Sequence, residues 1–336
     1  MVFELKIIIS GLDFIKVFMT IDLKYRKNRF EKLFSSKTFK NFEGLISFKS
    51  INKKKFDKIK IACIDFIIAS FQAELKFTLN TKNSKIKMNH ILKNIDKLYS
   101  ITQNGFVVPK SHSYKEYNKL MKLYYNLFDN YGLKKRIDSW QDPIGICIKY
   151  YNKKKIQNNK NNRAYHLTSN SHIESWAGYS NLGINTLLPI FGNTKINYTE
   201  FYKPKKTFHE ASINNISKGN YKKTISKNYF KTPLNKRLKK NYKCGNLVCW
   251  DNIILHNTKI TNNFSFRIFI VNQFIPKLSK KEFKYNKISK YRKSELLKHD
   301  LISNKKSYLK FFKKDDYKFK STLGGKRAAT QFVLIK

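Results

Sequence analysis

Residues 247–256 read Leu-Val-Cys-Trp-Asp-Asn-Ile-Ile-Leu-His, and residues 265–274 read Ser-Phe-Arg-Ile-Phe-Ile-Val-Asn-Gln-Phe. An Asp251-Asn252 turn separates two apolar runs in the first stretch, and the second stretch forms a further strand. Three short strands with turns every several residues predict an antiparallel barrel or sandwich. We expect a mainly β fold with flanking helices, a double-stranded β-helix of the jelly-roll or cupin-like type.

The sequence upstream supports this expectation. Gly183 and the Gly192-Asn193 pair bound an apolar run, which predicts another strand over residues 183–191. Apolar residues recur at helical spacing over 89–98 and 117–127, so we expect two amphipathic helices that support one sheet. Between these helices, Gly105–Pro109 predicts a short strand that enters a turn.

The pattern divides the chain into three parts. Residues 1–85 alternate short apolar runs with lysine-rich spacers, and we expect an N-terminal extension of mixed helix and strand packed on the barrel. Residues 86–280 are expected to form the barrel and its helices, with the long polar stretch 210–243 as an insertion loop. Residues 281–336 form a basic C-terminal segment.

Composition bounds the class of protein. The 336 residues carry 69 Lys and Arg against 22 Asp and Glu, a formal net charge of +47. Hydrophobic residues at 41% and aromatic residues at 15% are enough for a sizeable core and exclude a disordered basic tail. The charge has two interpretations: drift of an AT-rich genome toward lysine, or a polyanionic partner such as nucleic acid.

Cysteine usage and the hydropathy pattern bear on where in the cell the protein is expected. The four cysteines, Cys63, Cys147, Cys244 and Cys249, include no CxxC pair, which predicts reduced thiols in a cytoplasmic protein. Residues 1–10 lack the features of a secretory signal. The longest apolar run, residues 61–71, is much shorter than the ~20 residues that span a bilayer, so we expect no membrane span.

Two histidines and a glutamate have the spacing of a metal site. In an extended chain, His172 and Glu174 project from the same side because they are two residues apart. His256 follows the Asp251-Asn252 turn. Two histidines and one carboxylate are the ligand set that leaves three positions of an octahedral iron open for oxygen chemistry. Each residue alone is weak, but their order along the chain favours a metal site.

Arg267 would complete this site. It lies eleven residues after His256 in an alternating strand, where its guanidinium shares a face with Ser265. If that face lines the barrel, the buried charge needs a fixed anion. A dicarboxylate that chelates the metal at its other end would supply the anion, which points to 2-oxoglutarate.

These blocks resemble a known family. Residues 172–180, His-Ile-Glu-Ser-Trp-Ala-Gly-Tyr-Ser, then residues 185–189 and 245–256, are similar to iron- and 2-oxoglutarate-dependent oxygenases of sporadic carbohydrate-biosynthesis clusters. These are relatives of the phytanoyl-CoA dioxygenase group. The resemblance covers roughly residues 100–276.

The resemblance implies a role for each residue. His172, Glu174 and His256 would hold Fe(II), with 2-oxoglutarate and O2 as cosubstrates and Arg267 on the distal carboxylate. The implied reaction is hydroxylation, although related sites desaturate, epimerise or close rings. Two features depart from the family: Glu174 replaces the usual Asp, and Phe266 occupies a position where Thr is common.

Neighbouring side chains are secondary candidates. Asn185 or Thr186 would hydrogen-bond the cosubstrate, or would be ordinary polar groups of a strand. Trp176 and Tyr179 would stack on a sugar ring or cover the iron, or would be core aromatics. His209 with Glu210 is a competing metal candidate, and His166 fits the rim of the barrel.

Three classes of function stay open on the sequence. The first is an oxygenase acting on a carbohydrate, a nucleotide sugar or another small polar metabolite. The second is a catalytically silent basic jelly roll that binds a polyanion such as nucleic acid or acidic glycan. No nucleic-acid-binding motif is present, so the sequence disfavours nucleic acid. The third is a cupin-like isomerase or lyase. The oligomeric state is not determined by the sequence.

Overall fold

The computed structural model describes most of the chain between residues 23 and 298. The described residues are 23–35, 39–42, 44–75, 81–102, 105–107, 109, 111–152, 154, 172–203, 237–238, 242–289, 292–293, 296–298, 318–319 and 334–335. The expected insertion loop 210–243 therefore lies mostly outside the described residues. Among the described helices, none combines the length and apolar character needed to cross a membrane.

A large antiparallel sheet forms the centre of the fold. Its strands follow the order β1-β2-β8-β5-β10-β4-β11, and β3 pairs with β4. The strands are β1 (Lys40–Phe42), β2 (Ile46–Ser50), β3 (Phe106–Val107), β4 (Ile137–Asn152), β5 (Ile184–Gly192), β8 (Asn246–Asp251), β10 (Phe264–Pro276) and β11 (Leu296–Lys298). The strands expected over 183–191, 247–250 and 265–274 correspond to β5, β8 and β10.

A smaller antiparallel sheet lies on one side of the large sheet. It has the order β7-β6-β9 and consists of β6 (Asn197–Tyr202), β7 (Arg237–Leu238) and β9 (His256–Ile260). Phe201 of β6 packs its ring 5.2 Å from that of Trp250 of β8, so side chains of the two sheets meet. A separate pair joins β12 (Lys318–Phe319) to β13 (Leu334–Ile335).

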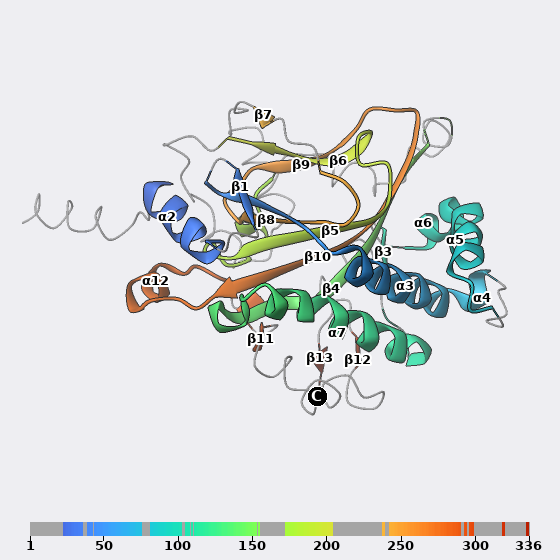
Figure 1. The fold of residues 1–336 in the computed structure, drawn as a ribbon, viewed down its shortest axis with the longest axis horizontal. Helices are drawn as coiled ribbons and strands as arrows, with labels where there is room; N and C mark the ends of the chain where they lie inside the picture. Colours follow the sequence, from blue (N-terminus) through green and yellow to red (C-terminus); the bar gives the residue numbers. More distant parts are fainter. Residues whose placement is uncertain are drawn as a thin grey trace, which may run out of the picture.

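Helices cover the opposite side of the large sheet (Figure 1). They are α3 (Lys53–Ser70) and α7 (Tyr114–Asn130), with α4 (Gln72–Leu75), α5 (Ser84–Lys93) and α6 (Ile95–Ile101) beyond them. Short 3-10 turns are η1 (Ser111–Ser113), η2 (Lys134–Arg136) and η3 (Glu174–Ala177). Near the edge of the fold lie α2 (Leu23–Leu33) and α12 (Lys280–Tyr285).

The amphipathic pattern of α7 explains how this layer is fixed. Its Phe128 ring packs edge-on against Trp140 of β4 and Phe274 of β10, with ring centroids 4.9 Å and 5.9 Å away. Such aromatic contacts between a helix and a sheet stabilise beyond the burial of their area. The helices expected over 89–98 and 117–127 are therefore present, although Asn94 separates the first into α5 and α6.

The fold is mainly antiparallel sheet with flanking helices, as the sequence predicts. One expectation needs correction, and two further features were not expected. Residues 253–255 form a turn and not a strand, so His256 is the first residue of β9 and not the end of a strand. The sixteen-residue strand β4 was not predicted, because its mixed polar and apolar residues carry no clear alternation. The chain also enters the large sheet before residue 86, through β1 and β2.

Candidate metal centre

The backbone joins the two parts of the sequence that supply the candidate ligands. The amide of His172 donates to the carbonyl of His256 at 2.9 Å, and the amide of His256 donates back at 3.0 Å. This reciprocal pair fixes the two imidazoles beside each other, with ring centroids 4.6 Å apart. A link across 84 residues of sequence is therefore made by only two hydrogen bonds at this point.

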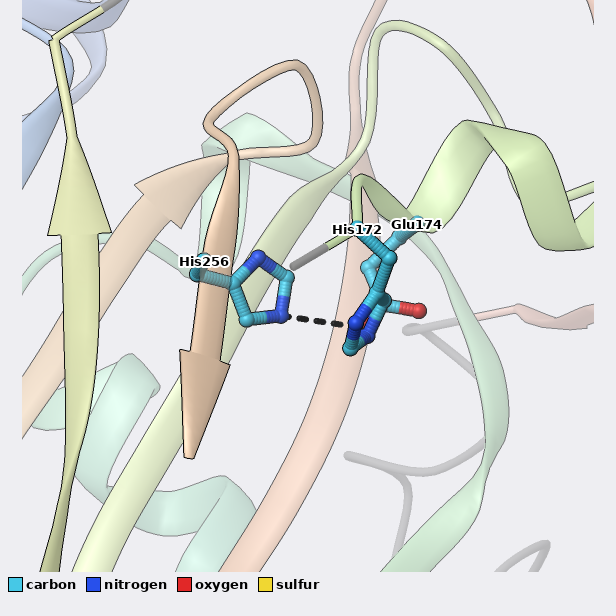
Figure 2. A group of neighbouring side chains, drawn as sticks. All are labelled: His172, Glu174 and His256. Carbon is cyan, nitrogen blue, oxygen red and sulfur yellow. Dashed lines mark ion pairs between the residues drawn. The ribbon is translucent and has the colours of Figure 1, made fainter. Parts of the chain in front are cut away.

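Local conformation brings Glu174 to the same place. Ile173 is extended and fully buried, so the side chains before and after it project to the opposite side. A carboxylate oxygen of Glu174 lies 3.7 Å from Nε2 of His172 and 3.3 Å from Nε2 of His256. One ligand atom from each residue lies within 4.8 Å of the others, and the three side chains converge (Figure 2).

The pKa shifts in this cluster favour the protonation states of metal ligands. Burial alone would raise the pKa of Glu174, but hydrogen bonds and charges from His172 and His256 outweigh it, so the carboxyl group is held ionised. Burial lowers the pKa of His256, and the neighbouring His172 lowers it further against the opposing effect of Glu174. A neutral imidazole next to a carboxylate is what a divalent cation requires.

The orientation of His256 is also fixed. Its Nδ1 lies 2.9 Å from the carbonyl of Ile254 and therefore donates to it, which leaves the lone pair on Nε2 for a ligand. The Trp250 ring packs edge-on at 5.2 Å from the other side. The Glu174 and His172 side chains retain 18% and 20% exposure, so the cluster is accessible from one side.

Arg267 is buried, as a binding role for an internal anion requires. Only 1% of the residue is exposed, and its guanidinium stacks 4.5 Å from the centre of the Phe269 ring. One Nη donates to the Tyr242 hydroxyl at 2.7 Å and to Thr199 at 3.4 Å, whereas Nε has no partner. Within the described residues no carboxylate pairs with it, so an incoming anion fits this position.

Tyr242 adds a donor beside Arg267. Its oxygen accepts both from Arg267 and from the backbone amide of Thr199, the latter at 2.6 Å. Because the hydroxyl oxygen of Tyr242 already accepts two hydrogen bonds, its O–H can act only as a donor toward a ligand. Sequence reasoning missed Tyr242 and Thr199, since no short motif connects either of them to Arg267.

The two strand candidates, Asn185 and Thr186, face opposite sides of β5. Thr186 donates to the carbonyl of Asn272 at 2.8 Å and lies 2.7 Å from the Tyr124 hydroxyl of α7, so it belongs to the layer between sheet and helix. Asn185 faces the small sheet beside its register partner Trp250. Its amide is fully buried, and neither polar atom has a hydrogen-bond partner among the residues that the structure describes.

The remaining candidates are placed less fully. Trp176 lies in η3, but its side chain is outside the described residues, as are His166, His209 and Glu210. Tyr179 is half-buried, and the Arg292 guanidinium lies 3.6 Å from its ring centre. One face of this ring is therefore already covered by a side chain of the C-terminal part.

Comparison with known proteins gives structural neighbours of low similarity. No protein-family model and no curated protein matches the chain. One solved structure, the non-heme alpha-ketoglutarate-dependent epimerase SnoN from nogalamycin biosynthesis, has 7% identity and a TM-score of 0.34, covering 74% of this chain and 82% of that one. An N-substituted L-amino acid dioxygenase from Burkholderia ambifaria AMMD has 8% identity and a TM-score of 0.33, covering 73% and 85%. The function proposed for this chain therefore rests on its own side chains.

Proposed function

We propose that the chain is an Fe(II)- and 2-oxoglutarate-dependent dioxygenase that hydroxylates or otherwise oxidises a carbohydrate, a nucleotide sugar or another small polar metabolite. The observation that carries the proposal is the convergence of His172, Glu174 and His256 on one point, with a carboxylate held ionised and His256 held neutral. Two histidines and one carboxylate suit Fe(II) and leave coordination positions for a cosubstrate and O2.

One group of residues would bind the metal, and a second group would bind and orient the cosubstrate. His172, Glu174 and His256 would bind the iron, which together with O2 supplies the oxidation of the substrate. Arg267 would bind the distal carboxylate of 2-oxoglutarate with its guanidinium, whose Nε has no partner among the described residues, and Tyr242 would donate its O–H to the same carboxylate. Asn185 is a further candidate contact for the cosubstrate, whereas the hydroxyl of Thr186 is committed to Tyr124 and Asn272.

The order of the strands supports a double-stranded β-helix. Along the chain, β5 belongs to the large sheet, β6 and β7 to the small sheet, β8 to the large, β9 to the small and β10 to the large. A chain that passes back and forth between two facing sheets winds as a jelly roll. In this arrangement His172, paired with His256, lies at the edge of the small sheet, and the Arg267 side chain lies between the sheets.

Turnover of the cosubstrate tests the proposal. Purified protein with Fe(II), O2 and 2-oxoglutarate is expected to form succinate, and His256→Ala is expected to lose at least about a hundredfold in rate because one ligand is gone. The matched control is His112→Ala, since His112 is an exposed histidine in η1. Iron-independent succinate formation, or equal loss in both variants, contradicts the assignment.

Arg267 distinguishes the oxygenase from a cupin-like isomerase or lyase. In the oxygenase, Arg267→Ala should weaken 2-oxoglutarate binding by at least about tenfold, or about 1.4 kcal/mol, because a charge-assisted contact is lost. Isothermal titration with Mn(II) in place of iron measures this binding without turnover. Unchanged affinity in the folded variant would contradict the role of Arg267 and favour the isomerase or lyase.

The substrate end of the site is the least constrained part of the proposal. Trp176 and Tyr179 follow the metal ligands directly, and both remain candidates for contact with a sugar ring. Arg292 covers one face of the Tyr179 ring, so such contact would have to use the opposite face. A screen would compare succinate formation in the presence and absence of each nucleotide sugar or free sugar. A compound that raises the rate and is itself oxidised would identify the substrate class.

A further inference from the structure

Helix α2 carries a buried arginine that contacts the segment after Glu174 and the turn before His256. Arg26 is 2% exposed although it lies on a peripheral helix. Its Nη1 donates to the carbonyl of Asn181 at 2.7 Å and to the carboxylate of Asp251 at 3.1 Å. One nitrogen thus joins three segments that are separated by 155 and 225 positions of sequence.

The first acceptor belongs to the loop that follows His172 and Glu174. Asn181 lies seven residues after Glu174, and its side chain bonds to the C-terminal part through the amide of Lys287 at 2.8 Å and the carbonyl of Tyr285 at 3.2 Å. Asn252 donates to the neighbouring carbonyl of Ser180 at 2.7 Å. Arg26 therefore binds this loop where it meets the turn that precedes His256.

The second acceptor controls the turn that ends at His256. A carboxylate oxygen of Asp251 accepts from the amide of Ile253 at 3.1 Å, and its carbonyl accepts from the amide of Ile254 at 2.9 Å. The carbonyl of Ile254 then accepts from Nδ1 of His256. A continuous chain of contacts runs from the Arg26 guanidinium through Asp251 and the turn to the imidazole.

We propose that Arg26 is a positioning residue of the metal centre and that α2 is its carrier. The inference rests on the proposed metal site, but assigns it a support outside the two sheets. Arg26 holds the loop after Glu174 and the turn before His256 at a fixed separation, and so sets the spacing of the three ligands. Groups that orient metal ligands without touching the metal usually change metal affinity by about ten- to a hundredfold when they are replaced.

Arginine suits this position for a geometric reason. Both contacts come from Nη1, which lies one bond further from the backbone than the Nζ of a lysine and is held in a fixed direction by the planar guanidinium, whereas a lysine is a point charge on a shorter, flexible stem. Arg26→Lys keeps the charge that neutralises buried Asp251 and is the conservative variant. It cannot reproduce both contacts with the same geometry, so it separates a positioning effect from loss of charge.

Cobalt binding tests the inference without turnover. Co(II) is titrated into the full-length apoprotein, and its visible d–d absorption reports both affinity and coordination geometry. Arg26→Lys is expected to weaken Co(II) binding by about tenfold or more and to change the band shape. The control is Lys87→Ala, which removes a 2.6 Å ion pair with Asp65 between α5 and α3, far from the ligands in sequence, and should leave both unchanged.

The outcomes separate this inference from the proposed function. Parent protein that takes up no Co(II) contradicts the metal site itself. Parent protein that binds Co(II), with an Arg26→Lys variant of equal affinity and identical spectrum, overturns the role of Arg26 alone. If Arg26→Lys does not fold, Asp251→Asn decides in its place: it keeps the shape and the acceptor but removes the charge. Weaker binding supports the inference, and unchanged binding overturns it.

Discussion

Lys149 is a nearly buried cation directly opposite Arg267 in the register of β4 and β10. Burial lowers its pKa, and Arg267 lowers it further against the opposing effect of Cys147. Because both side chains project from the same face of the paired strands, the interior of the fold holds two positive charges close together. Two positive charges on one interior face suit an anionic ligand.

We therefore predict that Lys149→Met weakens anion binding and changes how stability depends on pH, because one of two positive charges on the same face of β4 and β10 is removed. The folded pKa of Lys149 lies below the unfolded value, so the unfolded chain holds more protons between the two. Parent stability should then rise with pH in a window that ends near 10.5, and the variant should lack this rise.

Urea unfolding at pH 7 to 10 measures the pH dependence of stability, and isothermal titration with 2-oxoglutarate measures anion binding. A flat difference between parent and variant across this range would contradict the lowered pKa. Unchanged 2-oxoglutarate affinity in the variant would limit the anion site to Arg267 and Tyr242.

One face of strand β5 lies against helix α7 and the other faces the small sheet, and Thr186 belongs to the face against α7. Thr186→Val should cost about 1–3 kcal/mol of stability, because the buried Tyr124 hydroxyl loses its partner. It should not change 2-oxoglutarate affinity. Thr199→Val of β6 is the matched variant, since Thr199 lies against Arg267 and should weaken that affinity. Isothermal titration of both variants with 2-oxoglutarate tests this. Weaker affinity in Thr186→Val, with unchanged affinity in Thr199→Val, would contradict the assignment of faces.

The end of β5 also approaches the strand that carries Arg267. Gly192 has φ +104°, and a Cβ there would lie 2.3 Å from the carbonyl oxygen of Phe266 and 2.8 Å from Cα of Arg267. Gly192→Ala should therefore cost about 3 kcal/mol or more and displace Arg267, which weakens cosubstrate binding.

Gly132 provides the control for this substitution. It has φ +73° but nothing within 4 Å of the added Cβ. Gly132→Ala should cost about 1–2 kcal/mol from backbone strain alone and leave binding unchanged. Equal losses of stability and binding in the two variants would show that the close approach of β5 to β10 has no part in the site.

At the scale of the whole molecule, the ligands should stabilise the fold by linkage. In the proposed function, metal and cosubstrate would bind residues from β9, β10, η3 and the segment before η3, which unfolding separates. At a free concentration one hundred times the dissociation constant, each should add about 2.7 kcal/mol to the unfolding free energy. Thermal unfolding with and without Mn(II) and 2-oxoglutarate measures this. His256→Ala should abolish the metal response, and an undiminished response would contradict the ligand set.

The sequence by itself determined the local features of this protein. Alternation and turn residues predicted β5, β8 and β10, and helical periodicity predicted α7, because these patterns depend only on residues close in the chain. The two-residue spacing of His172 and Glu174 predicted a shared side for the same reason. The order of His172, Glu174 and His256 predicted a metal site, and their ligand atoms lie within 4.8 Å of one another, but metal binding and an anion at Arg267 stay predictions.

Only the tertiary structure decided which distant groups meet. Arg26 contacts Asn181 and Asp251 across 155 and 225 positions, and Tyr242 reaches Arg267 across 25. It also decided that Thr186 faces a helix, and that β4 forms a central strand without clear alternation. Sequence patterns fix backbone preference and the side from which a residue projects, but the partner on that side depends on how sheets and helices pack together.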